Sequence, residues 1–377
     1  MTRGFLKRYT NGEFSIHCES WSTKITEGII SMNRSSLKVS SLLVLCLFVA
    51  SLALAGCGGG APAKTETKQL KLTLYCGLME DHMAKAIQEF QKDTGIKVDA
   101  VRMSSGEVLG RIRAEKNNPK ASVWWGGPAD AFIAAKTEGL LEKYQSPVAA
   151  KIPAKFKDAD GYWTGIYVGY LGFSSNAKLI KEKGIPVPQT WQDLLRPELK
   201  GQVSMANPGA SGTAYTMLAT IVQLMGEEKG LEYMKKLNGQ IKVYQKTGTA
   251  PARMAGQGEV TVGLTFLHDA IKYQEEGMKD LVLSAPAEGT GYEIGAVAII
   301  KGGPDQEAAK KWVDWALSKK GQEFGQQVGS YQFLTNPEAN PPKQAEPIKN
   351  TKLIDYNLDW AGKNRSALVE KWNNAIK

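Results

Sequence analysis

Two hydroxyl-bearing loops precede predicted helices, and both have the chemistry of an anion cradle. Ser211-Gly212-Thr213 comes before a helix that the apolar pattern predicts over residues 214–225, and Ser104-Ser105-Gly106 opens another helix. At the start of a helix, free backbone N–H groups, side-chain hydroxyls and the positive end of the helix dipole converge on one point. Ser and Thr are also the ordinary caps of helices, so each loop has a purely structural interpretation as well.

Several other candidate side chains have both a binding and a structural interpretation. Trp125 ends a predicted strand, where it would either wall a cleft or pack under Pro128. Glu288 and Tyr292 flank a glycine turn, from which both side chains would reach a polar ligand. Glu293 is as readily explained by a structural role.

Three stretches of the sequence resemble enzyme motifs, but their residues do not have the arrangement that those motifs require. Ser211 lies in Gly-Ala-Ser-Gly-Thr, which lacks the Gly-x-Ser-x-Gly spacing of a nucleophile elbow. His268 and Asp269 are sequence neighbours, and an adjacent Asp rarely orients a His as a catalytic triad requires. The glycines of 289–295 are wrongly spaced for a dinucleotide fingerprint, and a predicted strand follows them rather than a helix. We therefore expect no enzymatic activity.

The N-terminal region has the pattern of a secretory signal. Residues 39–55 are uncharged and rich in Leu, Val and Ala, with Arg34 and Lys38 before them. A spanning helix needs about 20 apolar residues, so an uncleaved membrane helix is the disfavoured alternative. The run ends in Leu54-Ala55-Gly56-Cys57, which resembles the lipobox of bacterial lipoproteins. That resemblance implies cleavage before Cys57 and lipidation of its thiol, and two acyl chains would anchor the protein stably.

The segments on either side of this signal have no predicted fold. Residues 1–31 lack apolar periodicity, and the signal can begin at Met32, so we interpret them as a misassigned start. Residues 57–68 are small and polar and predict a flexible tether. Residues 1–56 thus comprise the upstream segment and signal peptide. We expect an exported protein, lipid-anchored to the membrane at the cell surface or in the periplasm.

The composition of the chain after the predicted cleavage site excludes some classes of protein. Residues 57–377 number 321, enough for two lobes, and their 41 Lys/Arg and 35 Asp/Glu give a net charge of +6 without a basic block. A nucleic-acid binder would cluster its basic residues. Cys76 would be the only free cysteine, and only two histidines remain, which argues against a zinc site. We expect no cofactor and no nucleic-acid partner.

Predicted strands and helices alternate along the chain. Strands over 70–75, 96–101 and 121–125 are each followed by a helix, and buried strands are predicted again over 260–266 and 293–300. Two helices, over 306–317 and 320–327, close the predicted core, and Trp312 and Trp315 are expected inside it. This alternation predicts an α/β fold with mainly parallel sheets covered on both faces.

The order of several motifs resembles the extracellular solute-binding proteins of the ferric-iron type. The resemblance covers residues 70–372 and is carried by Leu74-Tyr75-Cys76-Gly77, Val123-Trp124-Trp125-Gly126-Gly127, Thr190-Trp191-Gln192-Asp193-Leu194, Asn207-Pro208 with Ser211-Gly212-Thr213-Ala214-Tyr215, and the 289–295 stretch. It implies a type II periplasmic-binding-protein-like fold, with two lobes hinged by crossing strands. We place lobe 1 at 69–166 and 290–335, lobe 2 at 167–289, and a C-terminal segment at 336–377. It also implies a monomer that delivers its solute to the permease and ATPase subunits of an ABC importer.

The same resemblance narrows the ligand. In the iron binders of the family, adjacent tyrosines supply phenolate oxygens, and the matching pair here is His268-Asp269. Leu78 and Met79, after the first strand, also offer no hard oxygen ligand for ferric iron. His268-Asp269 resembles the pair in members that bind phosphorylated solutes, where His donates to phosphate and Asp accepts from a hydroxyl or pairs with an ammonium.

We therefore predict a small anionic solute that carries a phosphate or phosphonate, captured by closure of the cleft. Ferric iron or thiamine is the alternative within the family, and an enzyme or an adhesin on this scaffold is the distant one. The predicted ligand-binding residues are Gly77, Ser104, Ser105, Trp125, Gly126, Ser211, Gly212, Thr213, His268, Asp269, Glu288 and Tyr292.

Overall fold

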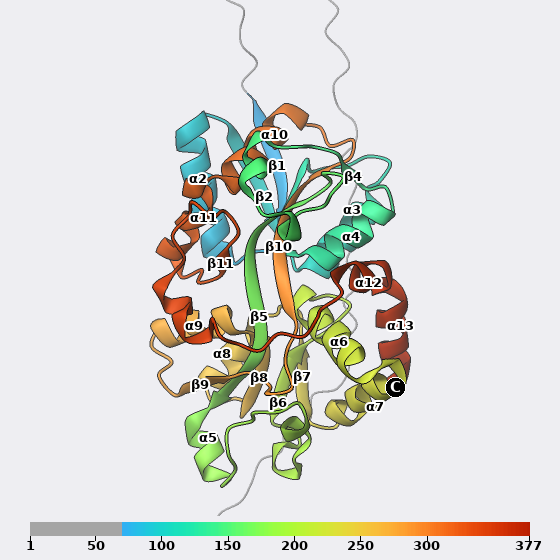
Figure 1. Ribbon diagram of the computed structural model, residues 1–377, viewed down its shortest axis with the longest axis vertical. Coiled ribbons are helices and arrows are strands. Elements are labelled where there is room, and N and C mark those ends of the chain that lie inside the picture. The colour runs from blue at the N-terminus through green and yellow to red at the C-terminus, as the bar shows by residue number, and fades with distance from the viewer. Residues whose placement is uncertain (1–69) are drawn as a thin grey trace, which may run out of the picture. The chain divides into compact units, whose positions relative to one another are not determined.

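The computed structural model describes residues 70–377, which fold as an α/β structure around one mixed sheet (Figure 1). The signal, lipobox and tether predictions, Cys57 included, lie outside the described residues. Within 70–377, no helix combines the length and apolarity that a membrane span requires.

One half of the sheet, called lobe 1 below, has the strand order β2-β1-β3-β10-β5. β1 runs parallel to β2 and β3, whereas β10 runs antiparallel to β3 and β5. Its strands are β1 (Lys71–Cys76), β2 (Lys97–Arg102), β3 (Val123–Pro128), β4 (Leu141–Glu142), β5 (Thr164–Asn176, first half), β10 (Tyr292–Ile300) and β11 (Phe333–Leu334). Its helices are α2 (Glu80–Thr94), α3 (Ser105–Ala114), α4 (Ala129–Thr137), α10 (Gln306–Leu317), α11 (Lys319–Glu323) and the 3-10 turns η1 (Pro147–Lys151), η2 (Ala154–Phe156) and η5 (Phe324–Val328).

Both faces of the sheet in lobe 1 are buried. Successive side chains of a strand point to opposite faces, so one strand contributes to the core on each side. Val123 and Trp125 of β3 face one apolar cluster, while Trp124 between them faces another. On the first face Trp312 of α10 is fully buried, as the sequence predicts. On the second, Phe132 of α4 stacks on Trp124 with ring centroids 3.9 Å apart. Helices therefore cover the sheet on both sides.

The other half of the sheet, lobe 2, continues from the second half of β5 in the order β5-β8-β6-β7. β6 is parallel to β7 and β8, and β5 is antiparallel to β8 and β9. Its further strands are β6 (Val203–Ala206), β7 (Ile241–Gln245), β8 (Val262–Phe266) and β9 (Leu281–Ser284). Its helices are α5 (Ala177–Glu182), α6 (Gly212–Met225), α7 (Glu227–Asn238), α8 (Ala250–Gly256), α9 (Leu267–Glu275), η3 (Gln192–Leu195) and η4 (Pro197–Leu199).

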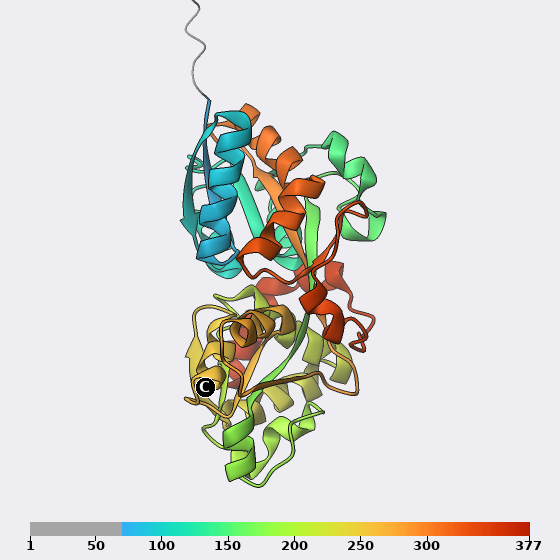
Figure 2. The same cartoon turned by 90° about the vertical axis from the view of Figure 1, so that its left-hand side faces the viewer.

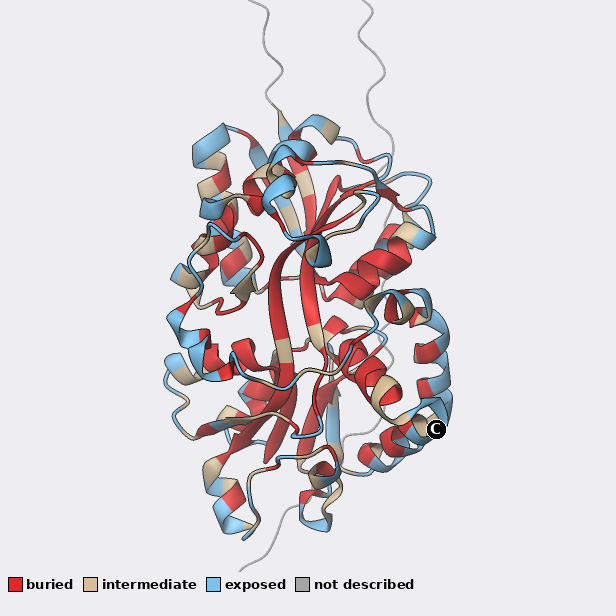
Figure 3. Ribbon diagram, in the orientation of Figure 1, coloured by how far each residue is buried: buried red, intermediate tan, exposed pale blue. Residues whose placement is uncertain are grey.

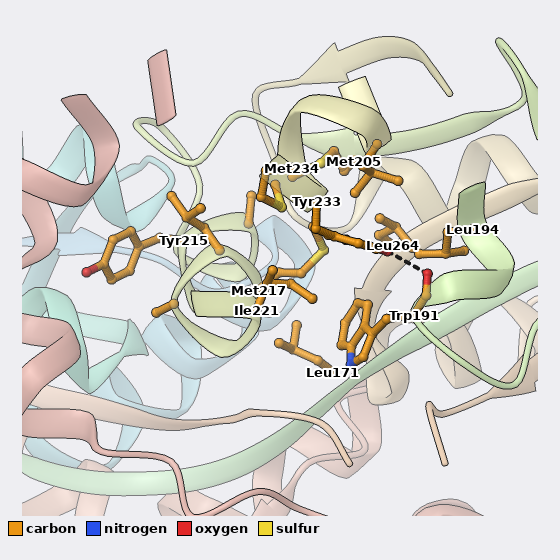
Figure 4. Packing of buried hydrophobic residues seen from close by; sticks show 14 of the residues in the cluster. Leu171, Trp191, Leu194, Met205, Tyr215, Met217, Ile221, Tyr233, Met234 and Leu264 are labelled. Carbon is orange, nitrogen blue, oxygen red and sulfur yellow. Dashed lines mark hydrogen bonds between the residues drawn. The ribbon is translucent and has the colours of Figure 1, made fainter. Parts of the chain in front are cut away.

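The core of lobe 2 lies where α6 packs against the sheet and α7 packs on α6 (Figure 4). Trp191 is 1% exposed, and the Tyr233 hydroxyl donates to its carbonyl oxygen at 2.6 Å. A buried phenol needs such a partner, because an unpaired polar group costs free energy in the interior. This bond fixes the irregular, proline-rich segment around Trp191 to α7.

Two strands connect the lobes. β5 has 13 residues, so its first half pairs with β10 in lobe 1 and its second half with β8 in lobe 2. β5 and β10 run through the middle of the molecule in Figure 1, and Figure 3 shows that they are largely buried. Figure 2 shows the lobes above and below this crossing. The predicted division at 166/167 lies within β5.

The C-terminal segment touches both lobes. It contains η6 (Lys343–Ile348), α12 (Leu358–Lys363) and α13 (Arg365–Ala375). α12 packs on α4 of lobe 1, whereas α13 packs on α7 and α6 of lobe 2. Between η6 and α12 the chain passes the start of β10, where the Thr290 N–H donates to Lys352 O and the Ile354 N–H to Thr290 O, both at 2.9 Å.

Candidate functional site

A pocket of about 480 Å³ lies between the lobes and is lined by residues of both. It sits at the carboxyl ends of β1, β2 and β3 in lobe 1 and of β6, β7 and β8 in lobe 2, whose following residues line it. Open α/β sheets bind ligands in this position, because the loops that leave parallel strands gather there.

Five helices of nine or more residues begin at this pocket. The first residues or caps of α2, α3 and α4 in lobe 1, and of α6 and α9 in lobe 2, line it. The lining residues concerned are Met79, Ser104, Pro128, Ser211 and Phe266. Each helix has nine to fifteen residues and directs the positive end of its dipole toward the same space. The pocket is therefore suited to an anion.

The two hydroxyl loops predicted from the sequence meet across this pocket. The Gly106 N–H donates to Ala210 O at 2.9 Å, which joins α3 of lobe 1 to the loop before α6 of lobe 2. The Ser104 hydroxyl donates to Lys246 O at 3.1 Å, a second bond between the lobes. The lobes thus stand closed on each other. Ser211 also caps α6, because its Oγ accepts from the Ala214 N–H at 3.3 Å.

Ser105 lies close to one glycine of each lobe, Gly127 of lobe 1 and Gly212 of lobe 2. A Cβ at Gly127 would come 2.0 Å from Ser105 Oγ, and a Cβ at Gly212 would come 3.0 Å from it. Gly127 also has φ +100°, a conformation that side chains disfavour. Its N–H donates to Tyr167 Oη at 3.1 Å. Glycine at these two positions leaves room for the Ser105 hydroxyl between the lobes.

Three titratable side chains form the buried wall of the pocket. His268, Asp269 and Glu293 are 4%, 7% and 3% exposed. His268 Nε2 lies 3.4 Å from Asp269 Oδ1 and 3.8 Å from Glu293 Oε1. Within residues 70–377, the buried His268 Nδ1 has no hydrogen-bond partner.

Burial shifts the pKa of each of these groups toward its neutral form. It lowers the pKa of His268 to about 3 and raises the pKa of Asp269 to about 7, against the opposing charges of Arg102 and Lys272. The pKa of Glu293 is raised well above its usual range by burial, with the Asp269 charge adding to the effect. Neutral imidazole and carboxyl groups both donate and accept hydrogen bonds, so this wall fits hydroxyl groups beside an anion.

The structure brings eight of the twelve predicted residues into the pocket: Gly77, Ser104, Ser105, Ser211, Gly212, Thr213, His268 and Asp269. Trp125 lies behind it and packs edge-on against Trp312, with centroids 5.2 Å apart. Gly126 is next to the lining residue Gly127 but does not line the pocket.

Glu288 and Tyr292 are also outside the pocket. Glu288 Oε1 accepts from the Trp191 N–H at 3.2 Å in lobe 2. Tyr292 lies opposite Tyr170 in the β5–β10 ladder, and its ring meets Tyr356 edge-on at 5.8 Å. Glu288 therefore contributes to the fold through this bond, and Tyr292 through its ring contact.

The predicted site lacks five polar residues that line the pocket. These are Arg102, Tyr167, Thr249, Gln332 and Glu293, the last of which the sequence explains as readily by a structural role. Arg102 is the last residue of β2, and Thr249 caps α8 after β7. A search for polar residues at the carboxyl end of each strand and in the four residues after it would have found both. Tyr167 lies inside β5, so only the crossing of the lobes exposes it to the pocket. Within 70–377, no group of three His, Cys, Asp or Glu side chains is placed to hold a metal ion.

The comparisons with known proteins agree with this geometry. The profile of a family described as bacterial extracellular solute-binding proteins matches residues 128–360. A Haemophilus influenzae protein is 39% identical over 92% of this chain and 99% of its own length. A Salmonella typhimurium periplasmic protein named for 2-aminoethylphosphonate binding is 32% identical over 76% of this chain and 86% of its own. The structure of the periplasmic binding protein AfuA from Actinobacillus pleuropneumoniae, with fructose-6-phosphate bound, is 42% identical with a TM-score of 0.79, covering 81% of this chain and 98% of that one.

Proposed function

Because this chain belongs to the bacterial extracellular solute-binding proteins, we propose that it is the substrate-binding component of an ABC importer for a small organic phosphate or phosphonate. The solute binds between the lobes, and closure of the lobes completes its hydrogen bonds. The closed surface is then what the permease and ATPase subunits of the importer recognise.

The observation that carries this proposal is the convergence of five helix N-termini from two lobes on one pocket. A phosphate or phosphonate group accepts several hydrogen bonds from such N–H groups and is stabilised by the helix dipoles. The hydroxyls of Ser105 and Thr213 line the same space and add donors. No single helix would supply as many donors to one anion.

The buried wall suggests what the rest of the solute looks like. His268, Asp269 and Glu293 offer neutral donors and acceptors at one side of the pocket. Such a set suits the hydroxyl groups of a sugar phosphate, and ionised Asp269 would suit the ammonium of an aminophosphonate. The relative that binds fructose-6-phosphate and the one named for 2-aminoethylphosphonate support both readings.

The proposal also includes export of the protein and its attachment to a membrane by a lipid anchor. Cleavage before Cys57 and lipidation of its thiol would hold the protein at the outer face of a membrane, with residues 57–68 as a tether. The protein would act there as a monomer and without catalysis. Incorporation of labelled fatty acid into the wild type, but not into Cys57→Ala, tests this part separately from ligand binding.

Thermal unfolding of the purified protein with a panel of solutes tests the ligand class. The panel holds hexose phosphates, phosphoglycerates, 2-aminoethylphosphonate, inorganic phosphate, thiamine and ferric citrate. A ligand at a hundred times its Kd adds about 2.7 kcal/mol to the free energy of unfolding. We expect a rise in melting temperature with a phosphorylated or phosphonate solute. A rise with ferric citrate or thiamine alone would refute the phosphate assignment.

A further inference from the structure

Lys272 of lobe 2 is seated in lobe 1. It lies on α9, one turn after Asp269, and its Nζ pairs with Asp81 Oδ2 in the first turn of α2. The same Nζ donates to Val328 O at 3.0 Å, at the end of η5. Glu276 Oε1, one turn further along α9, is 3.2 Å from Nζ.

Lobe 1 residues surround the aliphatic part of the Lys272 side chain. The Lys272 side chain is only 9% exposed, whereas the Asp81 side chain is 50% exposed. A Cβ at Gly329 would lie 3.1 Å from Lys272 Nζ and 3.2 Å from its Cγ, so the glycine leaves the groove that holds the chain. η5 in turn packs on α2. Every contact of the ammonium except that with Glu276 is therefore made by lobe 1.

A lysine in this position favours one arrangement of the lobes. Burial opposes the charged form of Lys272, but its hydrogen bonds to Asp81 and Glu276 hold its pKa above the usual value. The bond to Asp81 exists only while the lobes are close enough for Lys272 to reach α2. If the lobes separate, water replaces this bond around both charges, and the stabilisation is lost.

The two elements joined by this pair also form the pocket. α9 carries His268 and Asp269 in its first turn, and Met79 at the cap of α2 lines the opposite wall. Movement of α9 toward α2 thus brings the pocket walls together and forms the ion pair in one step. Lys272 itself does not line the pocket.

We propose that Lys272 is a positioning residue that raises affinity by holding the lobes closed over the solute, through its pairing with Asp81. This inference rests on the proposed function, because it requires a solute that binds between moving lobes. The apparent Kd of such a protein scales inversely with the fraction of molecules in the binding-competent state. Removal of either partner should lower the closed fraction and leave the contacts to the solute intact.

The test uses Lys272→Met and Asp81→Asn, each alone and combined, with the panel solute that the wild type binds. Asn keeps the side-chain oxygen that accepts from the His82 N–H at 2.8 Å, so Asp81→Asn removes charge without removing that bond. Asp81→Asn also leaves Lys272 next to Asp269, which separates closure from a direct electrostatic effect on the pocket. The matched controls are Lys178→Met, from the exposed Lys178–Asp280 pair within lobe 2, and Glu80→Gln, beside Asp81 in the same helical turn.

We expect each single variant to weaken binding by about tenfold, a typical size for coupling between two states. Most of the change should appear in the dissociation rate, and the double variant should be no weaker than either single one. The melting temperature without solute should stay near that of the wild type, which a merely structural role would not allow. The charge-exchanged protein Lys272→Asp with Asp81→Lys should recover part of the affinity, and both controls should bind as the wild type does.

Unchanged affinity in both single variants, or additive losses in the double variant, would overturn the assignment of Lys272. A wild type that binds no phosphorylated or phosphonate solute would instead refute the proposed function. The two failures are distinguishable, because only the second involves the unaltered protein.

Discussion

The Arg365 guanidinium pairs with the Asp130 carboxylate inside the protein, where α13 meets α4. The side chains are 4% and 0% exposed, and Thr216 of α6 donates its hydroxyl proton to the same carboxylate at 3.2 Å. Burial raises the pKa of Asp130 to about 6, and the Arg365 charge opposes that rise. One ion pair therefore joins the C-terminal segment, lobe 1 and lobe 2.

Replacement of Arg365 by Met should destabilise the fold severely. It leaves the Asp130 charge buried without its counter-ion, a change that typically costs about 3–5 kcal/mol. Urea unfolding would measure the loss, with Lys151→Met, from the exposed Lys151–Glu338 pair, as the control that stays near the wild type. A loss for Arg365→Met as small as that of the control would contradict the role assigned to the buried pair.

Two buried histidines predict acid sensitivity. Burial lowers the pKa of His82 to about 4 and of His268 to about 3, so the unfolded chain binds more protons than the folded one below pH 6.5. Stability should fall with decreasing pH by about 1.4 kcal/mol per pH unit for each histidine within these windows. The raised pKa values of Asp130, Asp269 and Glu293 act in the opposite sense, because the stability that each of them contributes is lost as pH rises toward its folded-state pKa.

His82→Gln isolates one of these effects. Gln can keep a hydrogen bond to Ser330, which His82 Nδ1 makes at 2.7 Å, and it does not titrate. Between pH 6.5 and pH 4 the melting temperature of the variant should therefore depend less steeply on pH than that of the wild type. Parallel curves would show that His82 protonates in the folded state as readily as in the unfolded chain.

The sequence predicts those features of the fold that depend on neighbouring residues, and it does not predict those that depend on distant segments. The strand predicted over 70–75 agrees with β1 within one residue, and α2 follows it as predicted, because apolar periodicity is a local signal. α9 was not predicted as a helix, since its nine residues follow β8 without a connecting loop. The boundary between strand and helix there is set by the turn at Phe266, which has no Gly or Pro to mark it.

The sequence predicts the kind of chemistry at the site better than it predicts which residues line the pocket. The hydroxyl loops at 104–106 and 211–213 are helix starts, and a helix start has the same geometry wherever the chain folds. Arg102 and Tyr167 enter the pocket only because the two lobes face each other across it. That relationship depends on the crossing of β5 and β10, which no local pattern encodes.

Substitutions of residues that line the pocket should weaken affinity for the solute, whereas substitutions of residues outside it should not. His268→Ala and Ser211→Ala should each weaken affinity for the panel solute while the protein stays folded. Ser211→Ala should also lose about 1 kcal/mol of stability, because Ser211 caps α6. Glu288→Gln, a residue outside the pocket, should bind as the wild type does in calorimetry. Equal affinity in all three would refute the assignment of the pocket.

Closure of the lobes predicts a difference between two glycines of α3. A Cβ at Gly106 would lie 2.1 Å from Gly209 O and 2.6 Å from Ala210 O, both backbone atoms of the other lobe. Gly106→Ala should therefore obstruct closure, and overpacking of about 1–3 kcal/mol corresponds to a loss of affinity of about 5- to 150-fold. Helix α3 itself should tolerate the change, because Ala is the better helix former.

Gly110, one turn further along the same helix, provides the matched control. A Cβ there meets nothing within 4 Å. Gly110→Ala should therefore keep the affinity of the wild type and gain about 0.5–1 kcal/mol in the free energy of unfolding from helix propensity. Calorimetry on both variants measures affinity, and scattering of the solute-bound protein measures closure. If Gly106→Ala binds and compacts like Gly110→Ala, the lobes do not need the contact between Gly106 and Ala210 to close.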